Sequence, residues 1–383
     1  MSRTRLAVVT GLSNASITAI GSELIAQGVL AEGNIADSAG ARGRPAVELS
    51  FNRRARHAAI IEIDVTRVRC SLVDYAGTLV DRIESPMAPE VLADTPPAMF
   101  LFERIDQLLR RNPAEAPSLQ HIAVSVQGIL DRSGDSLKWS PIAHMSGQSI
   151  VEPIRQRYGV ASTLVKRGGL LADGARLLYP DLGDQPLAAV FVGSTVAMGL
   201  SFPDRLAGPD FGATEFGHMN HIPGGALCRC GQKGCIEAYA ADYGVLRTAY
   251  AVPEHSPPAP KVPPAAYDEL VHLAQTGRRT SMHAFNLAGR AIGFGLSRLM
   301  TIAAPAHIVI TGPGASAFAL MRSEIETALR DSLVCRINGQ PTITVHHDER
   351  EPIFQGLLAS VLGVLDTSVS ALHNADAALS GVP

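Results

Sequence analysis

The sequence has no long apolar run. None of its hydrophobic segments reaches the roughly 18 residues that a helix needs to span a bilayer. Its first residues, MSRTRLAVVTG, also lack the apolar core of a secretory signal peptide. From these absences we expect a soluble cytoplasmic protein with no membrane partner. The 383 residues, 46% of them hydrophobic, suffice for two or three well-packed domains.

Charge of either sign is scarce as well. Charged residues make up 18% of the chain and the net charge is −3, so no overall basic field points to nucleic acid. Any contact with DNA therefore has to be local. Residues 1–56 stand apart, because their seven arginines and four acidic residues give about +3, against about −6 for the remainder. This asymmetry makes the N-terminal segment the candidate for DNA binding.

Cysteine is also rare. The chain has five cysteines, and three of them fall within residues 228–235, a spacing unlike that of a disulfide framework. With one nearby histidine they form a Cys₃His set that suits a closed tetrahedral zinc site: His218, Cys228, Cys230 and Cys235. Glycines within this segment allow the chain to turn tightly around an ion. We expect structural Zn²⁺ here; the alternative is a cluster of free thiols in a reducing compartment.

The first residues predict two short helices and the start of a hairpin. Residues 2–9 form the first helix, and Ser13 suits the N-cap of an amphipathic second helix that Gly28 ends. The apolar stripe of this second helix consists of Ile17, Ile20, Leu24 and Ile25. Its other face carries small polar residues, which suit a helix lying in a DNA major groove. The DNA-binding candidates there are Ser13, Asn14, Ser16 and Thr18.

A glycine- and arginine-rich segment, residues 40–45, follows the two helices. Arg42 and Arg44 in a flexible backbone suit contacts with phosphates or insertion into a minor groove. We therefore predict a DNA-binding head over residues 1–52. The alternative is an ordinary helical hairpin with a solvated loop.

The rest of the chain alternates between strands and helices. Short buried strands are predicted at residues 121–127, 187–192 and 307–311, with a strand, turn and strand over 58–74. Amphipathic helices are predicted at 97–111 and 282–303. This alternation indicates an α/β body.

The zinc segment carries a resemblance to a known family. Residues 215–237 contain E-x-x-H, nine residues, C-x-C-x₄-C and then x-E. This string resembles the signature of the ROK family (repressors, open reading frames and sugar kinases), whose members include the NagC- and Mlc-type sugar-responsive repressors. Gly43-Arg44-Pro45 resembles the end of the family's wing, and residues 61–77 and 307–314 resemble its first hairpin and a later glycine-rich turn. The resemblance covers nearly the whole chain.

The resemblance implies a fold and a site. The fold is a winged helix-turn-helix head, residues 1–52, before a two-lobed, actin-like sugar-kinase body. Residues 53–165 with the C-terminal helix 354–373 form its smaller lobe, and 166–353 form its larger lobe. The family's sugar-holding residues fall on Glu215, His218 and Glu237. The chemistry agrees, since carboxylates accept hydrogen bonds from vicinal hydroxyls and a metal-bound imidazole presents its other nitrogen. The alternative for both glutamates is support of the zinc site.

The sequence departs from the family's kinases at three places. The D-x-G-G-T turn reads Asp64-Val65-Thr66-Arg67, and a second glycine-rich loop is replaced over residues 194–199, so side chains stand where bare backbone would meet phosphate. The Asn-Asp pair that binds sugar and acts as general base becomes Lys166-Arg167, and neither cation accepts a proton at neutral pH. A shifted alignment would leave Asp173 as the base.

The Lys166-Arg167 pair also suggests a hypothesis about the ligand. Two cations in the cleft would favour an anionic ligand, such as a sugar phosphate or a sugar acid. The alternative is a surface pair turned away from the cleft.

We therefore expect a transcription regulator, a repressor, and not an enzyme. A homodimer or a dimer of dimers would place two heads on operator half-sites about one helical turn apart. A sugar or sugar derivative between the lobes would then change head spacing and DNA affinity. One alternative is an ATP-dependent sugar kinase with a vestigial head. Another is a ligand-binding protein without DNA binding. The helix that normally precedes this pair is missing, so either the start codon is misassigned or the head is truncated.

Overall fold

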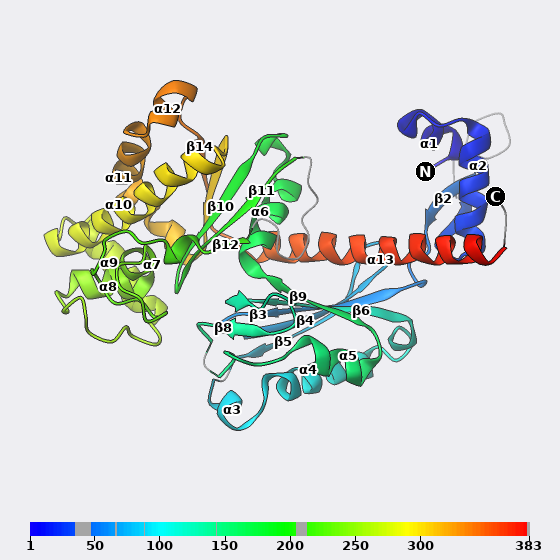
Figure 1. The fold of residues 1–383 in the computed structure, drawn as a ribbon, viewed down its shortest axis with the longest axis horizontal. Helices are drawn as coiled ribbons and strands as arrows, with labels where there is room; N and C mark the ends of the chain where they lie inside the picture. The colour runs from blue at the N-terminus through cyan, green and yellow to red at the C-terminus, as the bar shows by residue number, and fades with distance from the viewer. Residues whose placement is uncertain (35–46, 66, 88, 143, 204–212, 381–383) are drawn as a thin grey trace.

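The fold is mixed α/β, with two lobes and a small N-terminal head (Figure 1). The computed structural model describes residues 1–34, 47–65, 67–87, 89–142, 144–203 and 213–380. No helix within these ranges is long and apolar enough to cross a membrane.

The head consists of two helices and a two-stranded antiparallel ribbon. Its elements are α1 (Arg3–Thr10), α2 (Asn14–Ala26), β1 (Leu30–Asn34) and β2 (Val47–Phe51). The predicted N-cap is confirmed, because the Ser13 hydroxyl accepts a 3.1 Å hydrogen bond from the Ser16 amide. Two of the predicted DNA contacts, Arg42 and Arg44, lie outside the described residues.

The buried side of α2 is narrower than its sequence pattern predicts. Ile17 is buried, but Ile20 is 45% exposed. On α1, Val8 and Val9 are 80% and 69% exposed. An apolar stripe is covered only where another element packs against it, and among the described residues Val8, Val9 and Ile20 belong to none of the buried cores.

The first lobe is built on a five-stranded sheet of order β5-β4-β3-β6-β9. Its strands are β3 (His57–Ile63), β4 (Arg67–Asp74), β5 (Leu79–Pro86), β6 (Leu119–Val126) and β9 (Ala161–Lys166). Every residue of β3 is buried, because alternate side chains enter two different cores. Ile61 and Ile63 pack toward α4 (Pro97–Arg111) and α5 (Val151–Tyr158), whereas Ile60 faces the helices between the lobes. This lobe also contains α3 (Pro89–Asp94), β7 (Ile129–Leu130) and β8 (Leu137–Trp139).

The second lobe is built on a sheet of order β12-β11-β10-β13-β14. Its strands are β10 (Leu187–Val192), β11 (Val196–Ser201), β12 (Ala213–Thr214), β13 (His307–Thr311) and β14 (Thr342–His346). A helical layer packs on one face around the long, amphipathic α10 (Arg279–Ile302). The other helices of this lobe are α7 (Glu237–Ala240), α8 (Asp242–Ala249), α9 (Pro264–Gln275), α11 (Phe318–Arg330) and α12 (Leu333–Asn338).

Two helices, α6 (Arg167–Leu178) and α13 (Arg350–Ser380), pack against each other between the two sheets. Their backbones approach closely at glycines: a Cβ at Gly174 would lie 1.6 Å from the carbonyl oxygen of Pro352. The C-terminal helix was predicted to begin at residue 354, but it begins at Arg350. The earlier start places its first turn beside the cavities between the lobes, where Ile353 and Arg350 are lining residues.

The helix α13 then continues past the first lobe to the head (Figure 1). Val29, from the turn after α2, is buried in the same core as Val361 and Leu365 of α13. The Tyr75 hydroxyl donates a 2.7 Å hydrogen bond to Asp366, and the Tyr75 ring packs edge-on against Phe51 of β2. The head is therefore docked on both the first lobe and α13.

Candidate functional site

The predicted zinc ligands converge on one point. The ligand atoms of His218, Cys228, Cys230 and Cys235 all lie within 4.8 Å of one another. The Cys230 and Cys235 sulfurs are 3.8 Å apart, too far for a disulfide of about 2.05 Å, and the Cys228 sulfur is 3.8 Å from Nδ1 of His218. A tetrahedral ion with Zn–S bonds of about 2.3 Å requires sulfur–sulfur separations of about 3.8 Å. The donor set therefore fits Zn²⁺ in both chemistry and spacing.

Tight turns bring these ligands together. The Cys228 amide donates to the carbonyl of Gln232, and Gly231 has a left-handed φ of 86°. Gly234 also has a positive φ, and a Cβ there would lie 1.8 Å from the carbonyl oxygen of Ile222. Hydrogen bonds from the neighbouring thiols of Cys228 and Cys235 hold the pKa of Cys230 well below its usual range. A thiolate is the form that binds a metal.

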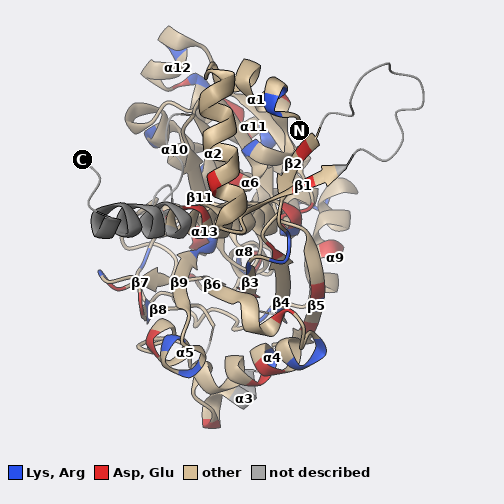
Figure 2. Cartoon of the chain, turned by 90° about the vertical axis from the view of Figure 1, so that its right-hand side faces the viewer, with Lys and Arg blue, Asp and Glu red and all other residues tan. Residues whose placement is uncertain are grey.

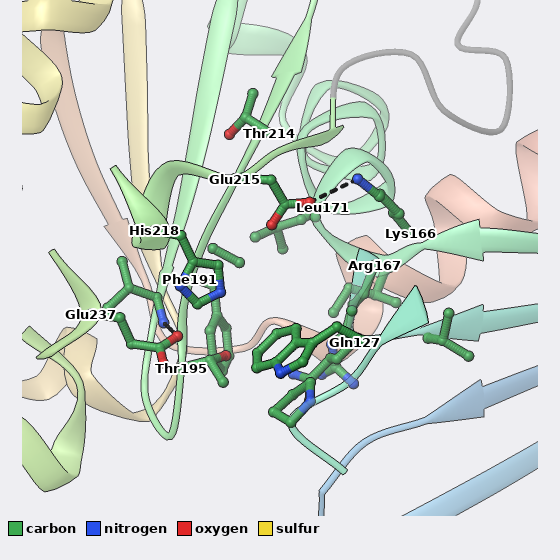
Figure 3. Close-up of a pocket in the computed structure, with 18 residues that line it drawn as sticks. Gln127, Lys166, Arg167, Leu171, Phe191, Thr195, Thr214, Glu215, His218 and Glu237 are labelled. Carbon is green, nitrogen blue, oxygen red and sulfur yellow. Dashed lines mark hydrogen bonds and ion pairs between the residues drawn. The ribbon is translucent and has the colours of Figure 1, made fainter. Parts of the chain in front are cut away.

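A cavity between the lobes, here called the ligand cleft, adjoins the metal cluster (Figure 3). The first lobe contributes Gln127 and Trp139, and the junction between lobes contributes Lys166 and Arg167. Its polar lining from the second lobe consists of Thr195, Thr214, Glu215, His218 and Glu237. The structure thus brings the three predicted sugar-binding residues, Glu215, His218 and Glu237, to one cavity. Because His218 turns Nδ1 toward Cys228, its other ring nitrogen is available on the cleft side.

Glu237 connects the metal cluster with the cleft. Glu237 is 1% exposed, and this burial raises the pKa of its carboxyl to about 8. One carboxylate oxygen accepts a 3.2 Å hydrogen bond from the Val196 amide, and the other lies 3.5 Å from the Cys228 sulfur and 3.4 Å from the Tyr243 hydroxyl. The two roles weighed for this glutamate, ligand contact and support of the metal site, are therefore compatible in this geometry.

Lys166 and Arg167 both line the ligand cleft, so the alternative of a surface pair turned away from it is wrong. Lys166 ends β9, and its ammonium forms a 2.8 Å ion pair with Glu215 of the second lobe, drawn as a dashed line in Figure 3. Arg167 begins α6, and its guanidinium lies 3.6 Å from Asp64 and 3.9 Å from Glu349.

The residue that a shifted alignment would make the base lies elsewhere. Asp173 is not among the residues that line the ligand cleft. It faces Ser201 and Arg176, and burial raises the pKa of its carboxyl.

The turn after β3, where the resemblance places the family's D-x-G-G-T motif, is crossed by an ion pair. The Asp64 carboxylate accepts a 2.9 Å hydrogen bond from the Arg67 amide and lies 3.4 Å from the Arg67 guanidinium. With Arg167 on its other side, Asp64 is flanked by two cations. A second cavity shares Gln127, Arg167 and Phe191 with the ligand cleft and is also lined by Asp64 and Arg67.

Several cleft residues carried no motif in the sequence. The Trp139 ring, at the end of β8, packs edge-on against the His218 ring at 5.2 Å between centroids. Gln127 directly follows β6, and its side-chain oxygen is buried with no hydrogen-bond partner among the described residues. The place of Gln127 directly after a predicted strand could have identified it, because ligands in open α/β sheets bind beyond the carboxyl ends of strands. Thr195 lies in the turn between β10 and β11, within the segment 194–199 that the resemblance had already singled out.

Comparisons with known proteins find both repressors and kinases. The xylose repressor of Bacillus subtilis (strain 168) is 22% identical over 87% of this chain and 84% of its own length. The DNA-binding transcriptional repressor Mlc of Escherichia coli (strain K12) is 25% identical over 86% and 81%. The glucokinase of Streptomyces coelicolor is 21% identical over 66% of this chain and 80% of its own length.

Solved structures show the same division. A ROK family transcriptional regulator, a homologue of the E. coli MLC protein, has a TM-score of 0.71 at 19% identity and covers 95% of this chain and 94% of its own. The ROK hexokinase of Thermus thermophilus has a TM-score of 0.62 at 20% identity, and the match covers 81% of this chain and 99% of the hexokinase. The protein-family model described as "ROK family" matches residues 58–358 of the sequence, and the chain therefore belongs to the ROK family.

Proposed function

We propose that this protein is a DNA-binding transcription repressor that responds to a sugar or a sugar derivative. The supporting observation is the extent of its likeness to other members of the family. The match with the regulator structure covers 95% of this chain. The match with the hexokinase structure covers 99% of the hexokinase but only 81% of this chain. The two matches differ by 14% of this chain, since 95 − 81 = 14, which is about 54 residues. The head and the segment that joins it to the body are about this long.

The residues of the former kinase site support a protein without kinase activity. The resemblance places Arg167 at the position of the general base. A guanidinium has no lone pair that can take a proton from a hydroxyl, and this one is flanked by Asp64 and Glu349. The turn at Asp64 has two arginine side chains where the family's kinases have bare backbone for phosphate. We infer that the body has kept the sugar side of the site and lost the phosphate-transfer side.

The metal has a structural role in this proposal. Zn²⁺ held by His218, Cys228, Cys230 and Cys235 would close the loops that carry Glu215 and Glu237 around the ligand cleft. It would also fix the tautomer of His218, so that the free ring nitrogen meets a sugar hydroxyl.

We interpret the head as a winged helix-turn-helix. The predicted contact residues at the N-terminal end of α2 are all exposed: the N-cap Ser13 and, on the helix, Asn14, Ser16 and Thr18. No lysine or arginine lies on α2, as Figure 2 shows, so this helix suits contacts with base edges more than with phosphates. Phosphate contacts would come from Arg5 on α1, which is exposed, and from Arg42 and Arg44. A homodimer or a dimer of dimers would present two such heads to an operator.

The helix α13 is the physical connection between ligand and DNA. Its first turn lines the ligand cleft through Ile353, and the preceding Glu349 faces Arg167. Its middle packs against Val29 of the head through Val361 and Leu365. Closure of the lobes on a ligand would therefore move the first turn of α13 and, through a continuous helix, the head.

A thermal-shift screen tests the function. The full chain is heated with neutral sugars, sugar acids, sugar phosphates and ATP–magnesium, because a ligand that binds only the folded state raises the melting temperature. Stabilisation by a carbohydrate, with no response to ATP–magnesium, supports a sensor that has lost kinase chemistry. A clear shift with ATP–magnesium, followed by phosphate transfer to a sugar, would show a kinase instead.

A further inference from the structure

The ligand cleft also indicates the chemical class of its ligand, an inference that rests on the proposed function. We propose that the effector carries both hydroxyl groups and one anionic group, as a sugar acid or a sugar phosphate does, and that Lys166 is the residue that selects this charge.

Of the two cations in the cleft, Lys166 is the one available to a ligand. The Arg167 side chain is 11% exposed and lies near two carboxylates, those of Asp64 and Glu349. The Lys166 side chain is 20% exposed and has one ion-pair partner within the described residues, Glu215, whose side chain is 44% exposed. An ammonium on a flexible stem, paired with a half-exposed partner, can change partners at little cost.

The partner of Lys166 is the predicted hydroxyl acceptor itself. A neutral sugar that hydrogen bonds to Glu215 would have to displace the ammonium, and it would leave Lys166 without a counter-charge inside a closing cleft. Such an unpaired cation opposes binding. A ligand with its own carboxylate or phosphate pairs with Lys166 while its hydroxyls take over Glu215. The number of ion pairs is then the same before and after binding.

Other cleft residues require more of the ligand than a charge. The buried oxygen of Gln127 lacks a donor within the described residues, and a hydroxyl group supplies one. The Trp139 ring lies beside His218 at the same cavity, and an aromatic face suits the apolar side of a sugar ring. A bare inorganic anion would satisfy Lys166 and leave these groups unused.

Fluorescence titration of the full chain tests the proposal, because Trp139 is its single tryptophan. The probes are matched trios of neutral sugar, uronate and 6-phosphate, built on glucose, galactose and mannose, with inorganic phosphate added as a separate probe. We expect the uronate or the 6-phosphate of one trio to bind at least about tenfold more tightly than its neutral parent. Comparison of the uronate with the 6-phosphate identifies which anionic group is selected. Equal or tighter binding of the neutral parent, or tighter binding of inorganic phosphate, overturns the proposal.

Two substitutions assign the selectivity to Lys166. Lys166→Met should bring the affinity ratio of anionic to neutral ligand close to one, whereas Glu215→Gln, which leaves Lys166 without its partner, should raise that ratio. Lys261→Met, at an exposed lysine in the proline-rich segment 252–264, is the matched control and should leave the ratio unchanged. A ratio unaffected by Lys166→Met, in a variant with an unchanged melting temperature, overturns the assignment.

The outcomes separate this proposal from the broader one. Selective binding of a neutral sugar that also changes DNA affinity would refute the anionic class and leave the proposed repressor intact. Failure of every carbohydrate to bind would refute both.

Discussion

The Arg56 guanidinium donates a 3.1 Å hydrogen bond to the carbonyl oxygen of Leu365, a residue 309 positions away in the chain. Arg56 belongs to the segment that leads out of the head, and Leu365 lies in the middle of α13. The hydrogen bond from Tyr75 to Asp366 lies one residue further along the same helix. Tyr75 also packs against Phe51 of the head, and Val29 of the head shares a buried core with Leu365. The head therefore adjoins a helix whose first turn lines the ligand cleft. These contacts give the proposed coupling between ligand and DNA a specific structural route.

Substitution at the start of this route should uncouple the ligand from DNA. Glu349→Gln removes the charge that faces Arg167 at 3.9 Å, just before α13 begins. We expect ligand affinity to change less than about threefold, while the effect of ligand on DNA affinity falls by about tenfold, or 1.4 kcal/mol of coupling free energy. Fluorescence titration and DNA anisotropy measure the two quantities. Glu326→Gln, at an exposed pair on α11, is the control. Normal coupling in the Glu349 variant would show that α13 does not carry the signal.

Loss of one ligand of the metal cluster should change both the zinc content and the stability of the protein. Cys230→Ser should lower the zinc content from one ion per chain to none, and it should reduce the free energy of unfolding by several kcal/mol, because metal binding and folding are coupled. Metal analysis and urea unfolding provide the measurements. Cys335→Ala, at a buried cysteine outside the cluster, should keep its zinc. If wild-type protein that was purified without chelators contains no zinc, the assignment of the cluster is wrong.

The parts of the site that were predictable from sequence are those that lie close together in the chain. The zinc ligands fall within 18 positions, so their spacing alone identified a cluster that the structure assembles. Likewise Ser13 was recognisable as an N-cap because the bond that it accepts is local. The helix predicted at 97–111 is α4 without a change of bounds, because its apolar residues repeat regularly and the stripe that includes Phe100, Ile105 and Leu108 is buried.

Contacts between distant segments were not predictable. Lys166 and Glu215 are 49 positions apart on different lobes, and no periodicity relates them. The role of Gln127 depends on where β6 ends in the sheet, which its own residue type does not reveal. The stripe on α2 was overestimated at Ile20 because a helical pattern shows which face is apolar and not whether anything covers it. The predicted roles of Arg42 and Arg44 remain predictions.

A buried histidine should make stability depend on pH. Burial lowers the pKa of His121 from 6.5 to about 4, and its residue is 1% exposed. Because the unfolded chain binds this proton more readily, stability is lost as the pH falls from about 6.5 toward 4; this histidine accounts for about 2 kcal/mol by pH 5. Urea unfolding at pH 7.5 and pH 5 measures the loss. His121→Gln, which can still hydrogen bond to Thr163, should show a smaller loss. An equal loss in both proteins would mean that His121 titrates normally in the folded state.

Substitutions in the head should change how DNA affinity depends on salt and on DNA sequence. Arg5→Ala should weaken binding to all sequences alike and reduce the slope of log affinity against log salt by about one, as expected for the loss of one phosphate contact. Asn14→Ala, on the exposed face of α2, should instead reduce the preference for the selected sequence over random DNA. Arg330→Ala, on α11 in the second lobe, serves as control. A change in slope as large for Arg330→Ala as for Arg5→Ala would place the DNA contact elsewhere.

The most direct test of the account is the DNA affinity of the full chain with and without ligand. Duplexes that bind are first selected from a random-sequence library, and fluorescence anisotropy then measures the dissociation constant as the stabilising carbohydrate is added. The account predicts selected sequences with two half-sites about one helical turn apart, and an affinity that changes at least about tenfold with ligand. Selection of no sequence above random DNA, or an affinity that the ligand leaves unchanged, would contradict it.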